Sequence, residues 1–337
     1  MKEKRNNRVS SFDVARLAGV SQSAVSRCYT PGASISEKSR AKVLKAAKEL
    51  NYSPNIIARS LVQKTTRIIG VVMNRYASPF YSRVLGEFTR KIQEKGHNIL
   101  LMNIHNEQGV DDILSTALQY QVDGLVITSA TLSSTVVESC LQTQTPVVLF
   151  NRYSMHNEVS AVYCDGSDGG RKAAELLLPR HRRFACIKGE EGSSTSRDRS
   201  QGFIQAIEEN GIRDYLCERG DFTYDSGYAA AERLLDRKDR PDAIFCVSDL
   251  MALGTMDAAR HKFNLKIPED LSVIGFDDID MASWSSYDLT TLRQPLITMV
   301  DAAISQLFRS IENLDEGTLV RKLKTDLITR TSTRHSP

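Results

Sequence analysis

The sequence predicts a small all-α head followed by a large α/β body built from two doubly wound parallel-sheet lobes. The head is indicated by short apolar stripes at helical spacing, each preceded by a serine that can cap a helix. The body is indicated by strand-like apolar runs that alternate with helical patterns from Arg67 onward. At 337 residues the chain is long enough for two or three domains. We expect a head over residues 1–53, a linker over 54–67 and a body over 68–337.

Charge is distributed unevenly between these parts. The chain carries a formal net charge of +3, but residues 1–67 hold 14 Lys and Arg against 4 Asp and Glu, an excess of ten positive charges. The remainder of the chain is therefore acidic by seven charges. A basic head on an acidic body predicts a polyanionic partner for the head alone.

Serines mark the starts of three expected helices in the head. Ser10 precedes FDVARLAGV with Asp13 three residues on, which resembles a capping box, and Ser21 can cap QSAVSRCY. Ser36 can cap EKSRAKVLKAAKELNY. We expect the inner faces to be formed by Val14, Leu17, Ala18, Ala24, Val25, Cys28, Val43, Leu44, Ala47 and Leu50. Two short helices joined by a glycine-containing turn and braced by a third form the helix-turn-helix pattern.

The second helix of such a motif can enter the major groove of DNA with its N-terminal side chains at the base edges. Gln22 could pair with adenine and Arg27 with guanine. Ser21, Ser23 and Ser36 suit contacts with phosphates. The alternative is a three-helix bundle with solvated charges, and the ten excess positive charges favour DNA binding over it.

The segment Pro54–Leu61, PNIIARSL, lies where the head meets the body. Eight residues are too few to form a stable helix alone, so an expected helix here needs a partner, which we take to be DNA. Leu61 beside Arg59 offers an apolar wedge next to a cation, as minor-groove insertion requires. With Asn55, these residues complete the DNA-binding candidates. The alternative is an interdomain linker with one buried leucine.

Together, DVARLAGVSQSAVSRCY and SEKSRAKVLKAAKELNYSPNIIARSL resemble the LacI/GalR family of bacterial transcription regulators. The likeness continues through nearly the whole chain. It implies a homodimeric repressor that reads a pseudo-palindromic double-stranded operator. It also implies that Gln22, Ser23 and Arg27 read bases, and that the PN..ARSL segment is a hinge helix whose Leu61 wedges into the minor groove.

The body is expected to contain two series of strands and helices. In the first, strands at 68–73, 98–104, 124–128 and 146–150 alternate with helices at 79–95, 110–120 and 133–143. The second has strands at 159–164, 183–189, 215–222, 243–249 and 272–278 with helices at 168–178, 200–210, 226–237 and 250–262. A helix at 295–314 and a strand within 323–330 close the chain.

The resemblance implies that the body has the type I periplasmic-binding-protein fold, with a small effector bound between the lobes. Three crossovers between lobes are then expected near Cys164, Arg293 and Arg321. Lobe 1 would comprise about 68–163 and 294–320, and lobe 2 about 164–293 and 321–337. The effector implied is a sugar or sugar derivative, with purine nucleobases as a minority case.

Polar and aromatic residues at the ends of the predicted strands are the effector-binding candidates, because sugars need cations, carboxylates, amides and aromatic faces. They are Asn74, Phe80, Tyr81, Asn151, Arg152, Arg199, Phe222, Ser248, Asp277 and Gln294. The elements SPFY, DRSQGF and GFDD resemble pocket motifs of the family, and they contain Phe80, Arg199 and Asp277. Alternatives stay open: Phe80 as a core residue, and Arg199 with Asp277 as an ion pair across the lobes.

Several other function classes lack support in the sequence. There is no GxGxxG after a strand, no GxxxxGK[ST], no HExxH and no GxSxG, so we expect no enzyme, cofactor or metal site. The six cysteines lie apart, without a CxxC pair, and are expected to be buried thiols. No signal peptide or membrane span is evident, which favours the cytoplasm. A solute-binding transport protein and an α/β sugar-processing enzyme with a fused head are the rival interpretations.

The tail after Leu327, ITRTSTRHSP, contains no leucine heptad of the kind that builds a helical tetramerisation bundle. The sequence therefore favours a dimer over a tetramer.

Overall fold

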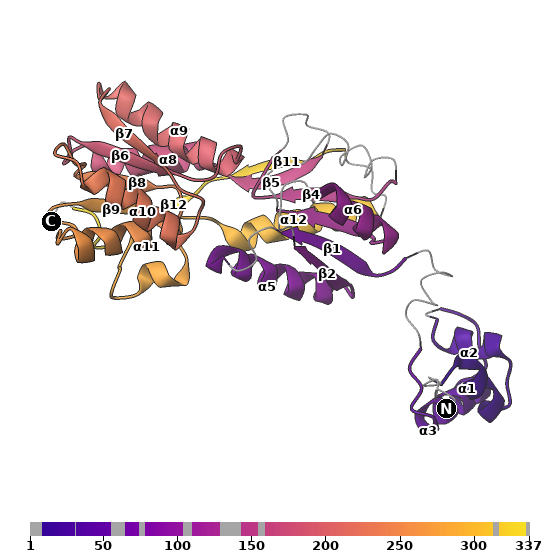
Figure 1. The fold of residues 1–337 in the computed structure, drawn as a ribbon. Helices are drawn as coiled ribbons and strands as arrows, with labels where there is room; N and C mark the ends of the chain where they lie inside the picture. The colour runs from indigo at the N-terminus through magenta and orange to yellow at the C-terminus, as the bar shows by residue number, and fades with distance from the viewer. Residues whose placement is uncertain are drawn as a thin grey trace. The chain divides into compact units, whose positions relative to one another are not determined.

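The computed structural model describes residues 9–30, 32–54, 65–73, 78–103, 110–128, 143–153, 159–312 and 317–334. The chain divides into two compact units, Met1–Thr66 and Arg67–Pro337, which we call the head and the core (Figure 1). Most of the expected hinge segment and the helix expected at 133–143 lie outside the described residues. Each unit is described by itself below.

The head consists of α1 (Ser11–Ala18), α2 (Gln22–Cys28) and α3 (Glu37–Glu49), packed around Val14, Val25 and Val43. The predicted capping box is confirmed: Ser10 Oγ accepts the Asp13 amide, and the Asp13 carboxylate accepts the Ser10 amide at 3.0 Å. Gly19 ends α1 in the left-handed conformation. The fold of the head agrees with the helix-turn-helix prediction.

Two predicted core positions of the head are wrong. Leu17 is 46% exposed and Leu44 is 49% exposed. Ala15 and Ala46 are buried instead, so the inner faces of α1 and α3 are rotated toward these small residues. Small side chains at the contact allow the short helices to approach closely.

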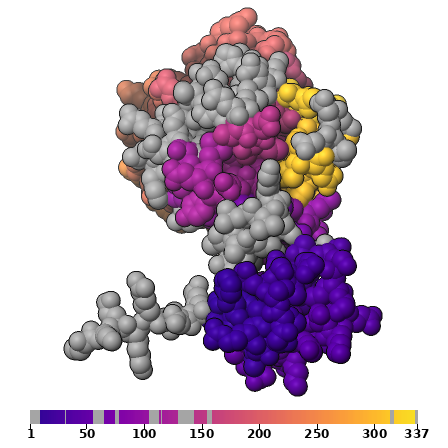
Figure 2. Space-filling view, turned by 90° about the vertical axis from the view of Figure 1, so that its right-hand side faces the viewer, coloured from indigo at the N-terminus to yellow at the C-terminus, as the bar shows by residue number. Residues whose placement is uncertain are grey.

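The first sheet of the core has six strands among the described residues, in the order β11-β5-β4-β3-β1-β2, and all its pairs are parallel. Their bounds are β1 Ile68–Met73, β2 Asn98–Asn103, β3 Gly124–Ile127, β4 Val147–Phe150, β5 Ser160–Cys164 and β11 Val320–Leu323. β11 pairs with β5, and Figure 2 shows residues from the end of the chain, in yellow, beside earlier residues of the core in magenta. The last part of the chain therefore completes a sheet that begins at Ile68.

Helices cover this first sheet. They are α5 (Pro79–Glu94), α6 (Val110–Gln119) and α12 (Leu296–Ile311). α12 packs against β3, β4, β5 and α5. Its apolar face, which includes Met299, Val300 and Leu307, is buried.

The second sheet also has six strands among the described residues, in the order β12-β10-β9-β8-β6-β7. They are β6 Phe184–Lys188, β7 Tyr215–Arg219, β8 Ala243–Cys246, β9 Ser272–Asp277, β10 Thr290–Arg293 and β12 Asp326–Ile328, of which β12 alone runs antiparallel to its neighbour. The accompanying helices are α8 Gly166–Leu177, α9 Ser194–Glu209, α10 Tyr224–Leu235 and α11 Asp249–Asp257. The predicted pair of parallel-sheet lobes is confirmed (Figure 1).

The chain passes between the two sheets in three places. The first passage follows Cys164 and the second follows Arg293, because β5 lies in the first sheet and β10 in the second. The passage expected near Arg321 lies instead after Leu323, since residues 320–323 pair with β5. The strand at 159–164 was likewise expected to open the second series but belongs to the first sheet. Neither β10 nor β11 was predicted from the sequence.

Candidate DNA-binding face and effector pocket

The outer face of α2 carries the predicted base-reading residues. Ser21 caps α2 by accepting the Ala24 amide at 3.2 Å, and it is exposed together with Gln22, Ser23 and Arg27. The opposite face, with Ala24, Val25 and Cys28, is buried in the head. The capping serine thus fixes the start of α2, and the buried stripe turns the polar residues outward.

Two hydrogen bonds hold the exposed polar side chains of α2 in the free head. Gln22 Nε2 donates to Ser11 Oγ at 3.2 Å, and Arg27 Nε donates to the Ser23 carbonyl at 3.3 Å. Neither contact is buried, so both groups can exchange these partners for base edges.

The start of α3 adds an exposed serine and several cations. Ser36 Oγ accepts the Ser39 amide at 3.2 Å, which satisfies one free donor of the first turn. Lys38, Lys42, Lys45 and Lys48 of α3 are all exposed. The described part of the head therefore offers a basic surface around the polar outer face of α2. Asn55, Arg59 and Leu61 lie outside the described residues.

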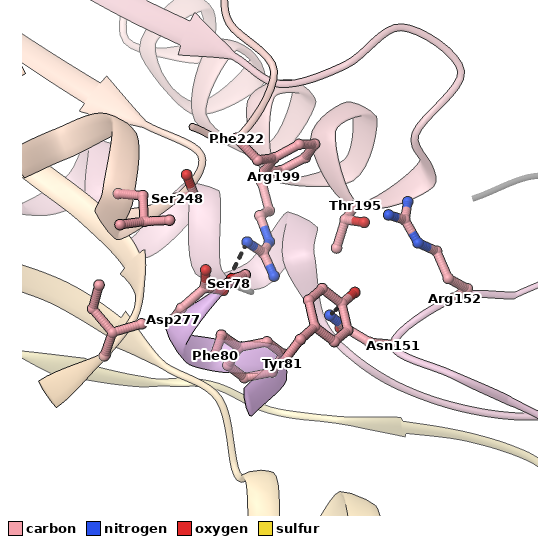
Figure 3. Close-up of a pocket in the computed structure, with 12 residues that line it drawn as sticks. Ser78, Phe80, Tyr81, Asn151, Arg152, Thr195, Arg199, Phe222, Ser248 and Asp277 are labelled. Carbon is pink, nitrogen blue, oxygen red and sulfur yellow. Dashed lines mark hydrogen bonds and ion pairs between the residues drawn. The ribbon is translucent and has the colours of Figure 1, made fainter. Parts of the chain in front are cut away.

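A cavity that is open to solvent lies where both lobes present the ends of their strands. It is lined by Ser78, Phe80, Tyr81, Asn151, Arg152, Thr195, Arg199, Phe222, Ser248, Leu250, Asp277 and Ile279. Figure 3 shows the Phe80 and Tyr81 rings of lobe 1 facing Arg199 and Phe222 of lobe 2.

Arg199 and Asp277 form the charged centre of the cavity. Arg199 is 2% exposed, and its Nη1 donates to Asp277 Oδ1 at 3.0 Å and to the Val247 carbonyl at 2.8 Å. The guanidinium carbon lies 3.7 Å from the centroid of the Phe276 ring, a cation–π contact. Both charged residues belong to lobe 2, so the expectation of an ion pair across the lobes is wrong.

Gln294 connects this charged pair to the second crossover. Its Nε2 donates to Asp277 Oδ1 at 2.7 Å, the same oxygen that accepts from Arg199. Burial raises the pKa of Asp277, while Arg199 and the Gln294 hydrogen bond act in the opposite direction. Buried atoms without a hydrogen-bond partner include Arg199 Nε and Gln294 Oε1. Both atoms are shielded from solvent, so neither is an exposed group of the cavity wall.

Three cavity residues hold their backbones in conformations that are rare for residues with side chains. Their φ angles are 58° at Asn151, 67° at Phe222 and 121° at Asp277. The Phe222 ring lies directly on Gly189, where an added Cβ would meet the ring Cζ at 2.3 Å. Backbone strain of this kind persists where the surrounding structure enforces it, and it gathers at ligand sites.

Contacts between the lobes border the cavity. Arg152 Nη1 donates to Ser193 Oγ at 2.5 Å, which joins the end of β4 to the start of α9. Next to it, Tyr153 Oη donates to Asp198 Oδ1 at 3.1 Å. Ser193 caps α9, so the first turn of that helix, including Thr195, faces the cavity.

A second buried carboxylate lies behind Asp277. Asp249 Oδ2 accepts the Ile279 amide at 2.9 Å and its Oδ1 accepts the Thr291 hydroxyl at 2.5 Å. Burial raises the pKa of Asp249 to about 7, and the nearby Asp277 charge acts in the same direction. Asp249 thereby ties the loop after β9 to β10 and supports the pocket floor from behind.

The structure brings together most of the predicted effector-binding residues. Those that line the cavity are Phe80, Tyr81, Asn151, Arg152, Arg199, Phe222, Ser248 and Asp277. Gln294 reaches the site through Asp277, and Asn74 lies outside the described residues. Phe80 is 4% exposed, so it is both a core residue and part of the cavity wall.

Sequence reasoning missed Ser78, Thr195, Leu250 and Ile279. Thr195 was missed because α9 was expected to begin at Ser200, whereas it begins at Ser194. The signal was present, since Ser193 is followed by a run of helix-compatible residues. Leu250 and Ile279 are aliphatic and follow predicted strand ends, where only polar and aromatic residues were considered.

No helix among the described residues has the length and apolar character needed to cross a membrane. In the same part of the chain, no group of three or more His, Cys, Asp or Glu is placed to hold a metal ion. Of the cysteines described there, four are buried as expected, but Cys217 is exposed, so the expectation of a buried thiol is wrong for Cys217. Burial raises the pKa of Cys164 to about 11.

Comparison with known proteins agrees with both halves of this description. Residues 12–55 match the profile of bacterial regulatory proteins of the lacI family, and residues 173–333 match that of a periplasmic binding protein-like domain. The HTH-type transcriptional repressor PurR of Pectobacterium atrosepticum is 33% identical over 96% of this chain and 97% of its own. The ribose operon repressor of Escherichia coli is 34% identical over 89% of this chain and 92% of its own.

A solved structure supports the same assignment. The Lac repressor bound to ONPG in the repressed state superimposes with a TM-score of 0.88 at 26% identity, covering 97% of this chain and all of that one. With relatives above 30% identity along nearly its whole length, a helix-turn-helix head and a two-lobed core, the chain belongs to the lacI family of bacterial regulatory proteins.

Proposed function

We propose that this protein is a transcription repressor that binds a pseudo-palindromic operator as a homodimer and changes its operator affinity when a small polar ligand enters the cavity. One observation carries the proposal: the same chain presents an exposed recognition helix and a cavity with a buried Arg199–Asp277 pair. The names of its relatives, PurR repressor and ribose operon repressor, support the regulatory role.

The ligand we propose is a sugar or a sugar derivative. Arg199 and Asp277 offer a donor and an acceptor to neighbouring hydroxyl groups, and Asn151 adds an amide. Aromatic rings at Phe80, Tyr81 and Phe222 can cover the C–H face of a pyranose or furanose. The Lac repressor structure that contains ONPG is consistent with this class of ligand.

The mechanism we propose is a shift between two states of the core. A ligand that binds one arrangement of the lobes more tightly favours that arrangement, and operator DNA favours one of the two in the same way. Ligand and operator therefore influence each other reciprocally through the core.

The experiment that tests the proposal is a selection of genomic fragments bound by the purified protein at near-physiological salt, with and without a pool of sugars. The expected result is a pseudo-palindrome of about two helical turns. If the pool of sugars abolishes enrichment of the pseudo-palindrome, the pool contains an inducer. If enrichment occurs only with the pool, the pool contains a corepressor. Absence of any motif in both conditions would contradict the proposal.

Matched charge variants sharpen this test. Arg27→Ala removes a proposed base contact, so we expect about 1–3 kcal/mol less discrimination at one operator position. Lys48→Ala removes an exposed charge at the end of α3 and should lower affinity for all sequences alike, with a smaller salt dependence. Equal behaviour of the two variants would show that α2 reads no bases.

The rival functions make different predictions. A transport protein would bind sugars without selecting DNA, and a sugar-processing enzyme would turn over members of the pool. We propose that neither occurs and that the protein works in the cytoplasm, where the chromosome is. Product formation from any sugar by the pure protein would contradict this part of the proposal.

A further inference from the structure

Helix α12 has one end beside the cavity and the other beside the residue where the core begins. It spans Leu296–Ile311, so 16 residues give it a length of about 24 Å. Leu307 packs so closely on β3 that a Cβ at Gly124 would meet its Cδ1 at 2.9 Å. A helix packed this tightly against a sheet moves as a rigid element.

The cavity end of α12 is tied to the charged pair. Gln294, two residues before the helix, is 3% exposed and donates to Asp277 Oδ1 at 2.7 Å. That oxygen also accepts from Arg199, so a ligand hydroxyl that approaches it competes with Gln294. The Gln294 carbonyl accepts the Leu296 amide at 2.8 Å, which links the side-chain contact to the helix start.

The far end of α12 contacts a cluster around Asp123. The Phe308 ring meets the His97 ring edge-on, with 4.8 Å between their centroids. His97 Nε2 lies 3.5 Å from Asp123 Oδ2, and that oxygen accepts the Arg67 amide at 2.9 Å. Asp123 therefore connects Phe308, through His97, to Arg67.

Arg67 is the first residue of the core, and its backbone is fixed from both sides. Its amide donates to Asp123, while its carbonyl accepts the Asn98 amide at 2.8 Å. Its φ of 54° is rare for a residue with a side chain, so these contacts determine the direction in which the chain leaves the sheet.

We propose that α12 couples the cavity to this exit, with Gln294 as the positioning residue at the cavity end and Phe308 at the exit end. The inference rests on the proposed function in that the cavity is taken to bind the effector. A change at Asp277 that displaces Gln294 shifts the start of α12, and Phe308 transmits the shift through His97 and Asp123 to the Arg67 amide. The direction in which the chain enters the core at Arg67 then changes.

Hydrogen exchange of the ligand-free, full-length protein tests this coupling. Substitutions alter the contacts of α12, and the exchange rate of the Arg67 amide reports the effect. Gln294→Met removes the bond to Asp277 and keeps the volume of the side chain; Gln294→Asn keeps the amide but is too short to reach. Phe308→Leu removes the ring contact at the exit. Ser305→Ala, on the exposed face of the same helix, is the matched control. Exchange is followed by mass spectrometry on overlapping peptides that cover residues 65–70.

The expected result is exchange of the Arg67 amide at least fivefold faster in the Gln294 variants and in Phe308→Leu, with no change in Ser305→Ala; fivefold is the lower limit typical of coupling between sites. An unchanged Arg67 amide in both Gln294 variants would overturn the proposal, even if Phe308→Leu accelerated exchange. Operator binding by the same proteins is measured separately. Failure of the wild type to bind DNA would contradict the proposed function and leave the exchange result to decide the coupling.

Discussion

Replacing Arg199 by Met should destabilise the core because it leaves a buried carboxylate without its cation. Met keeps most of the aliphatic volume, so the change isolates the charge and its hydrogen bonds. Arg199 is 2% exposed and donates both to Asp277 and to the Val247 carbonyl. Removing one partner of a buried pair costs about 3–5 kcal/mol, and we expect the upper part of that range because the Val247 carbonyl also loses its donor.

The loss of folding stability caused by Arg199→Met should depend on pH in a predictable direction. Burial already raises the pKa of Asp277 above its ordinary 3.8, and removal of Arg199 raises this pKa further. A carboxyl group whose pKa is higher in the folded state takes up a proton on folding, so its unfavourable contribution grows as pH rises through the folded pKa. The difference between wild type and Arg199→Met should therefore be larger at pH 8 than at pH 5.

Urea unfolding followed by circular dichroism, at both pH values, measures this difference. In an Asp277→Asn background Arg199 is itself a buried cation without its carboxylate, so Arg199→Met also removes that penalty and should cost at most about 1–3 kcal/mol for the remaining hydrogen bond. An equal loss in both backgrounds and at both pH values would refute the reasoning, because it would assign the cost to packing alone.

Three further predictions concern the operator, the helix packing and a second carboxylate. Leu61→Ala should weaken specific operator binding in a fluorescence titration and spare the salt-sensitive binding to random DNA; equal loss of both would refute the minor-groove wedge. Gly170→Ala should destabilise the core by several kcal/mol in urea, since its Cβ would meet the Arg199 carbonyl oxygen at 2.1 Å. The control Gly86→Ala, in α5 with nothing within 4 Å, should stabilise by about 0.5–1 kcal/mol. Asp249→Asn should reduce the fall in stability between pH 4 and 7, because burial raises the pKa of Asp249 to about 7; an unchanged pH profile would show that this group does not titrate there.

The sequence predicted elements wherever one local signal was strong. Ser10, Ser21 and Ser36 each cap a helix of the head, as their positions before apolar stripes indicated. The apolar runs at β1, β3 and β8 were long and flanked by helical patterns, so the sheets could be predicted. Polar and aromatic residues at the ends of these predicted strands then included most of the residues that line the cavity.

Features that depend on pairing between distant segments could not be predicted in this way. The strand β11, VRKL, is half charged because it lies at the edge of its sheet, and its sequence resembles a loop. Thr195 faces the cavity only because α9 starts at Ser194, and Leu17 is exposed because Ala15 fills the contact. Only β11 was decided by a segment far along the chain, its partner strand β5, whereas the start of α9 carried a local signal in Ser193.

The position of β11 and α12 has a consequence for synthesis of the protein. Strands β1–β5 leave the ribosome first, but the sheet they form lacks its edge strand and one covering helix until residues 296–323 are made. By Arg293 the ribosome has made every strand of the second sheet except β12. The first sheet, whose synthesis begins earlier, therefore waits longer for its missing parts.

A chain released before Leu296 would carry the complete head on a first lobe without α12. Such a product would expose the apolar surface that α12 covers on β3, β4 and β5. Exposed surface of that kind favours aggregation or proteolysis. The order of segments in this fold would thus favour the loss of incomplete chains that could otherwise occupy the operator without responding to the effector.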